Sequence, residues 1–502
     1  MNVLSFNSSR NFTLIFGILF FLGTILRFYY TPFQLPLTLD ALDNFTYASS
    51  INFYQNLPTE WSPPNIGWPL TLSFFFSIIS LDNTLEYMQL QRLISIILSS
   101  LIFIPVYFLC RRFFNEKISI IGASLFLFEP RIILNSTLGI TEPIFILLGI
   151  TSLLFFLNSN TKWIYLSFII VSFATLIRAE GFFIFLTLTS LFFLRFHILK
   201  DIFKIYIPSL TIYFLILIPS ILYKIDTHGN DAMFQRIAIG SNQILVNTQE
   251  NGFEQIFNGI QLFIEYLGWI MIPFFIILLP IGFFILLKNR SKDNVFIFFY
   301  LFFSSIPIFY GYFMQAQDTR YFYILYPIFS LISCFTIKYF FSKQNKKSFF
   351  IFFFMMSIII ASIGFSEYKK IDYEKEQEFN KISLLISKDI SGINYHPSFA
   401  SYIRASEVPY VWPFLFYDKT YKIEIISYSN YETLDSFVGN NQNLTHLIVD
   451  DNPNLKPFLR EIYENESKID YLEKTFDSKE FGYAHNVKLF KINFEKFEKQ
   501  MN

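Results

Sequence analysis

Long apolar segments recur through the first three quarters of this 502-residue chain and constrain its fold more than any other feature. A helix of about 20 predominantly apolar residues is long enough to cross the hydrocarbon of a bilayer. We predict about eleven such helices. They lie near residues 11–30, 88–110, 118–134, 141–157, 162–177, 180–196, 205–223, 262–287, 294–313, 321–341 and 348–365. The shorter apolar stretch at 66–80 favours a helix that lies at the membrane interface or re-enters it.

Composition supports an α-helical polytopic membrane protein. Charged residues make up only 16% of the chain, against roughly 25% in soluble domains. The net charge of zero gives no indication of a nucleic-acid partner. Cys110 and Cys334 both lie inside apolar segments, so we predict no disulfide framework.

Basic residues are concentrated in alternate loops, and this pattern predicts the orientation. Because cytoplasmic loops carry an excess of Lys and Arg, the basic loops are expected to face the cytoplasm. The first loop (31–87), the turn at 135–141, the loop at 224–261 and the turn at 314–320 then face outside. With eleven spans, the tail after residue 366 also faces outside.

The tail has the composition of a soluble domain. "KIEIISYS", "LTHLIVDD" and "VKLFKINF" are typical of short strands, and "NPNLKPFLREIYENE" is typical of a helix between two of them. We therefore predict a transmembrane domain at residues 1–366, with a large first outer loop (31–87), and an extracytoplasmic soluble α/β domain at residues 367–502.

Two carboxylates follow directly after the first apolar segment, in "LPLTLDALDNFTYASS" (residues 35–50). If this stretch is helical, Asp40, Asp43 and Tyr47 share one face. Partial desolvation at a membrane edge raises the pKa of a carboxylate and suits it to accept a proton. The alternative is structural, since Asp40 is also a suitable helix N-cap and Asp43 suits a first turn.

Further ionisable residues lie at the predicted outer ends of the spans. Several have a structural alternative: a helix start at Thr141–Pro143, an Arg–Glu pair in a turn, a tyrosine of the interfacial belt, or a solvated histidine. Arg131 has no structural role that is visible in the sequence. Together they place several arginines and carboxylates on one membrane face, where polar residues are functional candidates by default. These candidates are Arg131, Glu142, Arg178, Glu180, His228, Asp318, Arg320 and Tyr321.

This combination suits one kind of chemistry. Arginine is the preferred bidentate partner of phosphate, and a polyprenyl-phosphate donor presents its phosphate at the depth of the membrane edge. A carboxylate base would deprotonate an acceptor hydroxyl while the arginines stabilise the departing phosphate. The pattern therefore favours glycosyl transfer from a lipid-linked sugar.

Five motifs resemble those of the GT-C superfamily of polytopic glycosyltransferases, close to the protein O-mannosyltransferases and the aminoarabinose transferase that modifies lipid A. "DNFTYA" resembles the acidic first-loop motif D-E-x-x-Y-A, with Asn44 in place of the second acid. "NIGWPLTLSFFF", "EPRIILNSTLGITEPIFILL", "ATLIRAEGFFIF" and "DTRYFYILYP" resemble later family motifs and occur in the family's order. The resemblance covers about residues 10–340.

The resemblance implies roles for individual residues. Asp43 matches the base-type acid, and Asp40 remains the alternative because the second acid is missing. Glu142, Arg178, Glu180 and Arg320 would line the cavity for donor and acceptor. Some family members bind a divalent metal through first-loop acids. With Asn44 at that position we predict no metal and no other cofactor.

We therefore expect an integral protein of the cell membrane, a lipid-phosphate-dependent hexosyltransferase whose active site faces outside. Its partners would be a polyprenyl- or dolichyl-phosphate sugar, membrane lipids, and an acceptor that is a glycan, a protein or a lipid. The alternative is a transporter or flippase of lipid-linked sugars without glycosyl transfer. Such a protein is expected to carry charged or broken-helix positions near the midplane, and the sequence has few of these.

Overall fold

The computed structural model describes residues 10–58, 65–81, 84–158, 160–196, 198–229, 254–288, 294–342, 347–370, 373–391, 398–400, 424–426, 431–441, 444–451, 455–465 and 469–501. The chain divides into two compact units. One contains residues 1–31, 37–79 and 90–370, and the other contains residues 32–36, 80–89 and 371–502. We describe each unit by itself.

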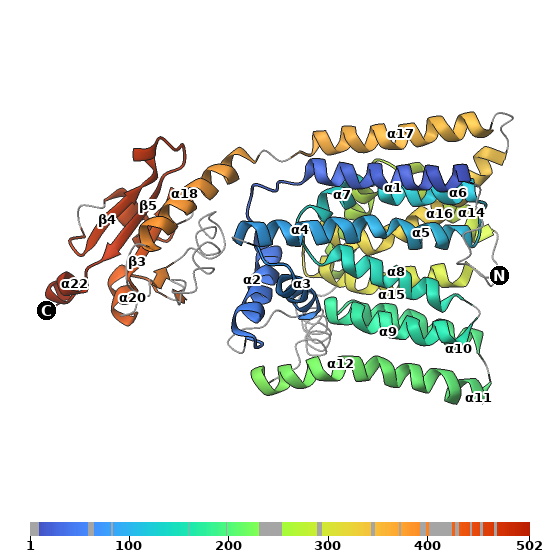
Figure 1. Cartoon of the computed structure of the whole chain (residues 1–502), viewed down its shortest axis with the longest axis horizontal. Helices are drawn as coiled ribbons and strands as arrows, with labels where there is room; N and C mark the ends of the chain where they lie inside the picture. Colours follow the sequence, from blue (N-terminus) through green and yellow to red (C-terminus); the bar gives the residue numbers. More distant parts are fainter. Residues whose placement is uncertain are drawn as a thin grey trace. The chain divides into compact units, whose positions relative to one another are not determined.

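The chain up to Lys370 is almost entirely helical. Its long helices run side by side, and α2 and α3 lie across one end of them (Figure 1). The helices are α1 (Arg10–Tyr30), α2 (Leu39–Tyr54), α3 (Gly67–Ile78), α4 (Thr84–Leu101), α5 (Phe103–Arg111), α6 (Glu116–Leu127), α7 (Pro130–Ser136), α8 (Glu142–Phe156), α9 (Thr161–Ile177), α10 (Gly181–Arg195), α11 (Leu199–Asp201), η1 (Ile202–Tyr206), α12 (Ile207–His228), a helix at Glu254–Met271, α14 (Phe275–Lys288), α15 (Val295–Phe313), η3 (Thr319–Leu325), α16 (Tyr326–Ser342) and α17 (Lys347–Tyr368).

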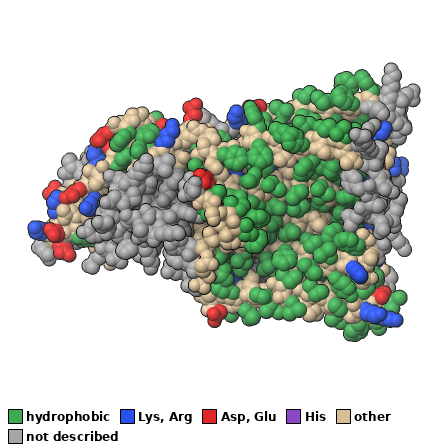
Figure 2. Space-filling model, viewed as in Figure 1, with side chains coloured by type: hydrophobic (Ala, Val, Ile, Leu, Met, Phe, Trp, Pro, Cys, Tyr) green, Lys and Arg blue, Asp and Glu red, His purple; other side chains and the backbone are tan. Residues whose placement is uncertain are grey.

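The outer surface of this unit is apolar. Hydrophobic side chains cover most of its described surface on the face shown in Figure 2. Large apolar residues such as Phe21, Phe284 and Phe352 are more than half exposed, at 64%, 68% and 60%. Surfaces of this kind are unfavourable in water and favourable against lipid tails, so the prediction of an α-helical membrane protein is confirmed.

Each of the eleven predicted apolar segments is helical in the structure. Six helices in the described part of the chain are long and apolar enough to cross a membrane by themselves, or up to eight if two bent pairs count as one span each. The pairs are α6 with α7, bent by 52°, and Glu254–Met271 with α14, bent by 109°. Four shorter apolar helices, α3, α8, α9 and α10, add to these. The count of eleven spans stays a prediction.

The second unit is built on a five-stranded sheet in the order β2-β1-β3-β5-β4. β1 is parallel to β2 and β3, whereas β5 is antiparallel to β3 and β4. The three strands and the helix predicted in the tail correspond to β2, β3, β5 and α21, and the predicted combination of strands and helices is confirmed. The elements are α18 (Glu374–Ser391), β1 (Ser398–Ala400), β2 (Glu424–Ile426), α20 (Leu434–Asn440), β3 (His446–Asp450), α21 (Pro457–Glu464), β4 (Leu472–Asp477), η6 (Ser478–Phe481), β5 (Val487–Ile492) and α22 (Phe494–Met501).

Helices cover both faces of this sheet. On one face, Phe379 and Ile386 of α18 pack in a cluster with Ile448 and Leu489. On the other face, α20, α21 and α22 form a larger cluster with residues of β3, β4 and β5. Because both faces are covered, every residue of β3 is buried, which explains its continuous apolar run.

Candidate active site

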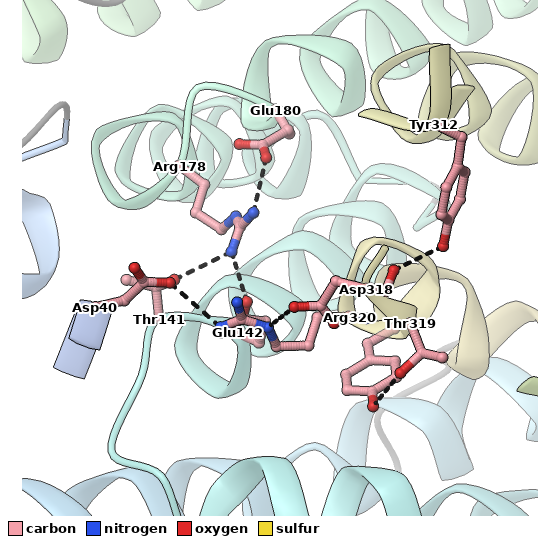
Figure 3. Close-up of polar contacts among 10 residues, drawn as sticks. Asp40, Thr141, Glu142, Arg178, Glu180, Tyr312, Asp318, Thr319 and Arg320 are labelled. Carbon is pink, nitrogen blue, oxygen red and sulfur yellow. Dashed lines mark hydrogen bonds and ion pairs between the residues drawn. The ribbon is translucent and has the colours of Figure 1, made fainter. Parts of the chain in front are cut away.

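Four segments far apart in the sequence bring polar side chains together in the helical unit (Figure 3). They are the first turn of α2, the N-terminus of α8, the turn between α9 and α10, and the turn that leads into η3. Each of these is a helix end, where backbone groups lack intrahelical partners and polar side chains are favoured.

Arg178 is the centre of the first cluster. Its two terminal nitrogens donate to different carboxylates: Nη1 to Glu142 at 2.7 Å and Nη2 to Glu180 at 2.8 Å. Nη1 also lies 3.3 Å from the hydroxyl of Thr141. Burial alone would lower the pKa of Arg178, but Glu180 and Glu142 raise it above its usual value. The guanidinium is therefore a permanent positive charge.

Arg320 is the centre of the second cluster, beside the first in Figure 3. Its Nε donates to Asp318 at 2.5 Å and its Nη1 to Asp40 at 3.3 Å. The side chain of Asp318 is one-third exposed, whereas that of Asp40 is two-thirds exposed. The side chain of Asp318 also caps η3, because it accepts a hydrogen bond from the backbone N–H of Arg320 at 2.8 Å. The backbone carbonyl of Asp318 accepts a hydrogen bond from the hydroxyl of Tyr312. Asp318 therefore orients Arg320, and Asp40 is its more weakly held partner.

A pocket of about 460 Å³, including its open mouth, joins the two clusters. One part of its wall is polar and the other is apolar, as in a site for a molecule with a charged head and a hydrocarbon chain. The polar part consists of Glu142, Arg178, Glu180, Arg320 and Tyr321. The rest consists of Phe145, Ile146, Ile184, Ser304, Pro307, Ile308 and Ile324.

The sequence of α8 explains why its N-terminus lies at the pocket. Glu142 stands at the first helical position and Pro143 follows it, in the first turn, where the missing N–H of proline costs no helical hydrogen bond. An acidic side chain there is favourable to the helix dipole.

The structure brings seven of the ten predicted site residues to this pocket or into direct contact with its lining. They are Asp40, Glu142, Arg178, Glu180, Asp318 and Arg320, and Tyr321 joins them in the lining of the pocket. Asp43 lies one turn after Asp40 on α2 and is exposed.

Of the remaining predicted residues, Arg131 has other surroundings. Arg131 is mostly buried and pairs with Glu129 at 3.5 Å. It also donates to the carbonyl of Ile272 and stacks 4.6 Å from the ring centre of Phe365. His228 is the last residue of α12, and its side chain lies outside the described residues. Asp231 and Arg236 of the same loop also lie outside them.

Sequence reasoning missed the apolar wall and the buried amide of Gln91. The wall residues belong to segments that are apolar throughout, so periodicity does not separate a pocket-lining face from a lipid-facing one. Gln91 was detectable in principle, because a polar residue inside an apolar helix is a functional candidate. In the described part of the chain, no group of three or more His, Cys, Asp or Glu side chains is placed to hold a metal ion. The prediction of no cofactor stays a prediction.

Comparisons with known proteins agree with this architecture. Residues 62–223 match the family described as dolichyl-phosphate-mannose-protein mannosyltransferase. The fold is similar to that of ArnT from Cupriavidus metallidurans bound to undecaprenyl phosphate, with 9% identity, a TM-score of 0.62, and coverage of 96% of this chain and 98% of that one. No curated protein matches.

A second group of similar structures is archaeal. The oligosaccharyltransferase AglB from Archaeoglobus fulgidus, in complex with an inhibitory peptide and a dolichol-phosphate, has 13% identity and a TM-score of 0.53, covering 88% of this chain and 70% of that one. The same enzyme tethered to an acceptor peptide has 13% identity and a TM-score of 0.56, covering 87% and 69%. The chain is thus an integral membrane protein, and its resemblance to the GT-C superfamily of polytopic membrane glycosyltransferases is confirmed.

Proposed function

We propose that this protein transfers a sugar from a polyprenyl-phosphate-linked donor to an acceptor hydroxyl or amide on the extracytoplasmic face of the cell membrane. The observation that carries the proposal is the pocket, whose polar part contains Arg178 and Arg320 together with Glu142, Glu180 and Tyr321, and whose remaining wall is mainly apolar. Similar structures with undecaprenyl phosphate and with dolichol-phosphate support a lipid-phosphate donor.

The donor's phosphate would bind at Arg178 and Arg320, and its first isoprene units would lie against the apolar wall. Guanidinium groups bind phosphate oxygens in a planar, bidentate way. The N-terminus of α8 contributes a favourable dipole at the same place. Glu142 and Glu180 would keep Arg178 oriented before the donor arrives, because each carboxylate holds one of its terminal nitrogens.

The reaction is a displacement at the anomeric carbon. The acceptor oxygen or nitrogen forms a bond to this carbon, and the bond from the carbon to the phosphate oxygen breaks. The acceptor's proton passes to an aspartate of α2, and polyprenyl phosphate leaves as an anion stabilised by the two arginines. The proton on the aspartate then passes to water.

Asp40 and Asp43 are both candidates for the base. The 3.3 Å contact with Arg320 places Asp40 beside the proposed phosphate site. The family motif favours Asp43, which lies on the following turn of the same helix. A donor phosphate that binds Arg320 would release Asp40 from this contact, so that its carboxylate becomes available when the substrate is present.

The test compares Asp40→Asn, Asp43→Asn and the double variant of the full-length protein in nanodiscs. The probes are undecaprenyl- and dolichyl-phosphate monosaccharides with a radiolabelled sugar, and release of the sugar from the lipid is measured. We expect the double variant to lose at least 100-fold in rate, as is usual when a general base is removed. Whichever single variant shows the same loss identifies the base.

The matched control is Asp226→Asn, which alters an exposed carboxylate of α12. It should retain the wild-type rate. Undiminished sugar release by the double variant would contradict the proposal, and so would movement of labelled lipid across the bilayer without any glycosyl product. The second result would favour a flippase.

A further inference from the structure

One buried side chain joins the helix that carries Asp40 to the turn that leads into Glu142. The amide Nε2 of Gln91, in α4, donates to the carbonyl of Ala41 at 2.9 Å and to the carbonyl of Gly139 at 2.7 Å. Ala41 directly follows Asp40, and Gly139 shortly precedes Glu142. Two of the four carboxylates that contact the pocket arginines, those of Asp40 and Glu142, therefore lie on segments that are linked through one amide.

The turn at Gly139 is held by several buried donors. Its carbonyl also accepts from the indole N–H of Trp68 at 3.3 Å, and the neighbouring carbonyl of Thr137 accepts from Nε of Arg92 at 3.1 Å. Gly139 has a φ of +77°, which favours glycine. A Cβ at this position would lie only 3.2 Å from Cγ of Gln91, so the close approach of α4 also requires glycine.

The backbone before Asp40 needs an external restraint. Leu39 has a φ of +48°, a conformation that residues other than glycine rarely adopt, and its side chain is 76% exposed. Such conformations persist where surrounding contacts hold them, and they are concentrated at active sites. Thr38, the N-cap residue, makes no capping hydrogen bond with its side chain. The bond from Gln91 to Ala41 supplies a restraint just after the strained residue.

The carbonyl oxygen of the Gln91 side chain indicates that this residue does more than fill space. Gln91 is completely buried, and its Oε1 has no hydrogen-bond partner among the described residues. A buried acceptor without a partner is destabilising, and a hydrocarbon side chain of the same length would avoid this cost. The amide is therefore best explained by its two donated bonds.

We propose that Gln91 is a positioning residue that fixes Asp40 and Glu142 relative to the pocket arginines. It contacts neither the pocket nor the proposed reacting atoms, and acts through the carbonyls of Ala41 and Gly139. Its effect on rate rests on the proposed function, whereas its effect on the two backbone segments does not.

The test uses Gln91→Met in the full-length protein in nanodiscs, because methionine keeps the length of the side chain and loses both donors. The matched control is Gln89→Met on the same helix, where the amide donates to the carbonyl of Phe33 at 3.0 Å. Hydrogen–deuterium exchange is measured along the chain, and sugar release from a labelled undecaprenyl-phosphate donor is measured in parallel.

We expect Gln91→Met to speed exchange about tenfold in segments 39–46 and 137–142 and to leave the other helices unchanged. We expect kcat to fall about 10- to 100-fold with an unchanged KM for the donor, since small displacements of catalytic groups have effects of this size. Gln89→Met should leave segment 137–142 and kcat as in the wild type.

Two results would overturn the proposal. One is wild-type exchange in both segments. The other is faster exchange spread over the whole bundle, because it would show that Gln91 stabilises the fold in general. If the wild type itself releases no sugar, the proposed function fails, and the exchange measurement still decides the role of Gln91.

Discussion

Asp40 has two roles that compete with each other. It is the exposed partner of Arg320 at 3.3 Å, and it is a candidate base for the reaction. An exposed ion pair of this kind contributes little, typically 0–1 kcal/mol. The negatively charged phosphodiester of an incoming donor can therefore displace the carboxylate from the guanidinium.

This competition predicts opposite effects of two similar substitutions on donor binding. Asp40→Asn removes a negative charge that competes for Arg320, and we expect undecaprenyl phosphate to bind about threefold to tenfold more tightly. Asp318→Asn removes the residue that orients Arg320, so binding should weaken. Isothermal titration calorimetry on the protein in nanodiscs measures both, and weaker binding to Asp40→Asn would refute the displacement of Asp40 by phosphate.

The residues of the site differ in how far the sequence could predict them. Arg178, Glu180 and Glu142 occur at helix ends on the predicted outer face, and the structure places all three in one cluster. Arg131 has the same sequence context, yet it contacts Glu129 and Phe365 instead. Arg131 follows the bend between α6 and α7, where Pro130 begins α7. The proline indicates a break in the helix, but it does not indicate which side chains the bend brings together.

At the scale of helices, close crossings inside the membrane depend on small residues. Gly122 of α6 lies against Cys110 of α5 and Cys334 of α16, whose sulfurs are 3.9 Å apart. A Cβ on Gly122 would overlap Sγ of Cys334 and would lie 3.0 Å from Sγ of Cys110. The three helices therefore cross at a point that has no room for a methyl group.

We expect Gly122→Ala to destabilise the protein by about 1–3 kcal/mol, the usual cost of overpacking. Cys334→Ala in the same chain should recover most of this loss, since it removes the overlapping sulfur. The control is Gly17→Ala in α1, where no atom of the described residues lies within 4 Å of an added Cβ. Thermal unfolding in detergent measures all three. Equal melting temperatures for Gly122→Ala and the wild type would show that the helices can separate at this crossing.

Most helices and strands could be predicted from the sequence because the spacing of their apolar residues is visible within each short segment. β3 and β5 were predicted from apolar runs, whereas β4 has three exposed residues in succession and lacks a regular alternation. The interruption coincides with an irregular register between Lys474 and Phe476, so a simple two-residue period does not hold there. The register is set by pairing with β5, which is not a property of the local sequence.

At the scale of the whole molecule, we expect the second unit to lose stability in acid. His446 is buried in β3, opposite Lys491 of β5. Burial, together with the positive charge of Lys491, lowers the pKa of His446 to about 4. The unfolded chain binds a proton near pH 6.5, whereas the folded unit binds it only near pH 4. Stability is therefore complete above pH 6.5 and falls between pH 6.5 and pH 4.

Over this range the unit should lose about 3 kcal/mol of stability. Replacement of His446 by Gln removes the titrating group and should flatten this part of the pH profile. Hydrogen exchange of β3 and β5 in the full-length protein at pH 4 to 7, corrected for intrinsic exchange rates, measures the effect. The same slope in the His446→Gln protein would assign the pH dependence to other groups.

The charge balance of the pocket region has a consequence for turnover. Two guanidiniums, of Arg178 and Arg320, face four carboxylates, of Asp40, Glu142, Glu180 and Asp318. The site is thus more negative than positive before any phosphate arrives. When the sugar leaves, the lipid phosphate gains negative charge in surroundings that are already anionic. The four carboxylates therefore offset part of the attraction that the two arginines exert on the spent carrier, and they should speed its release.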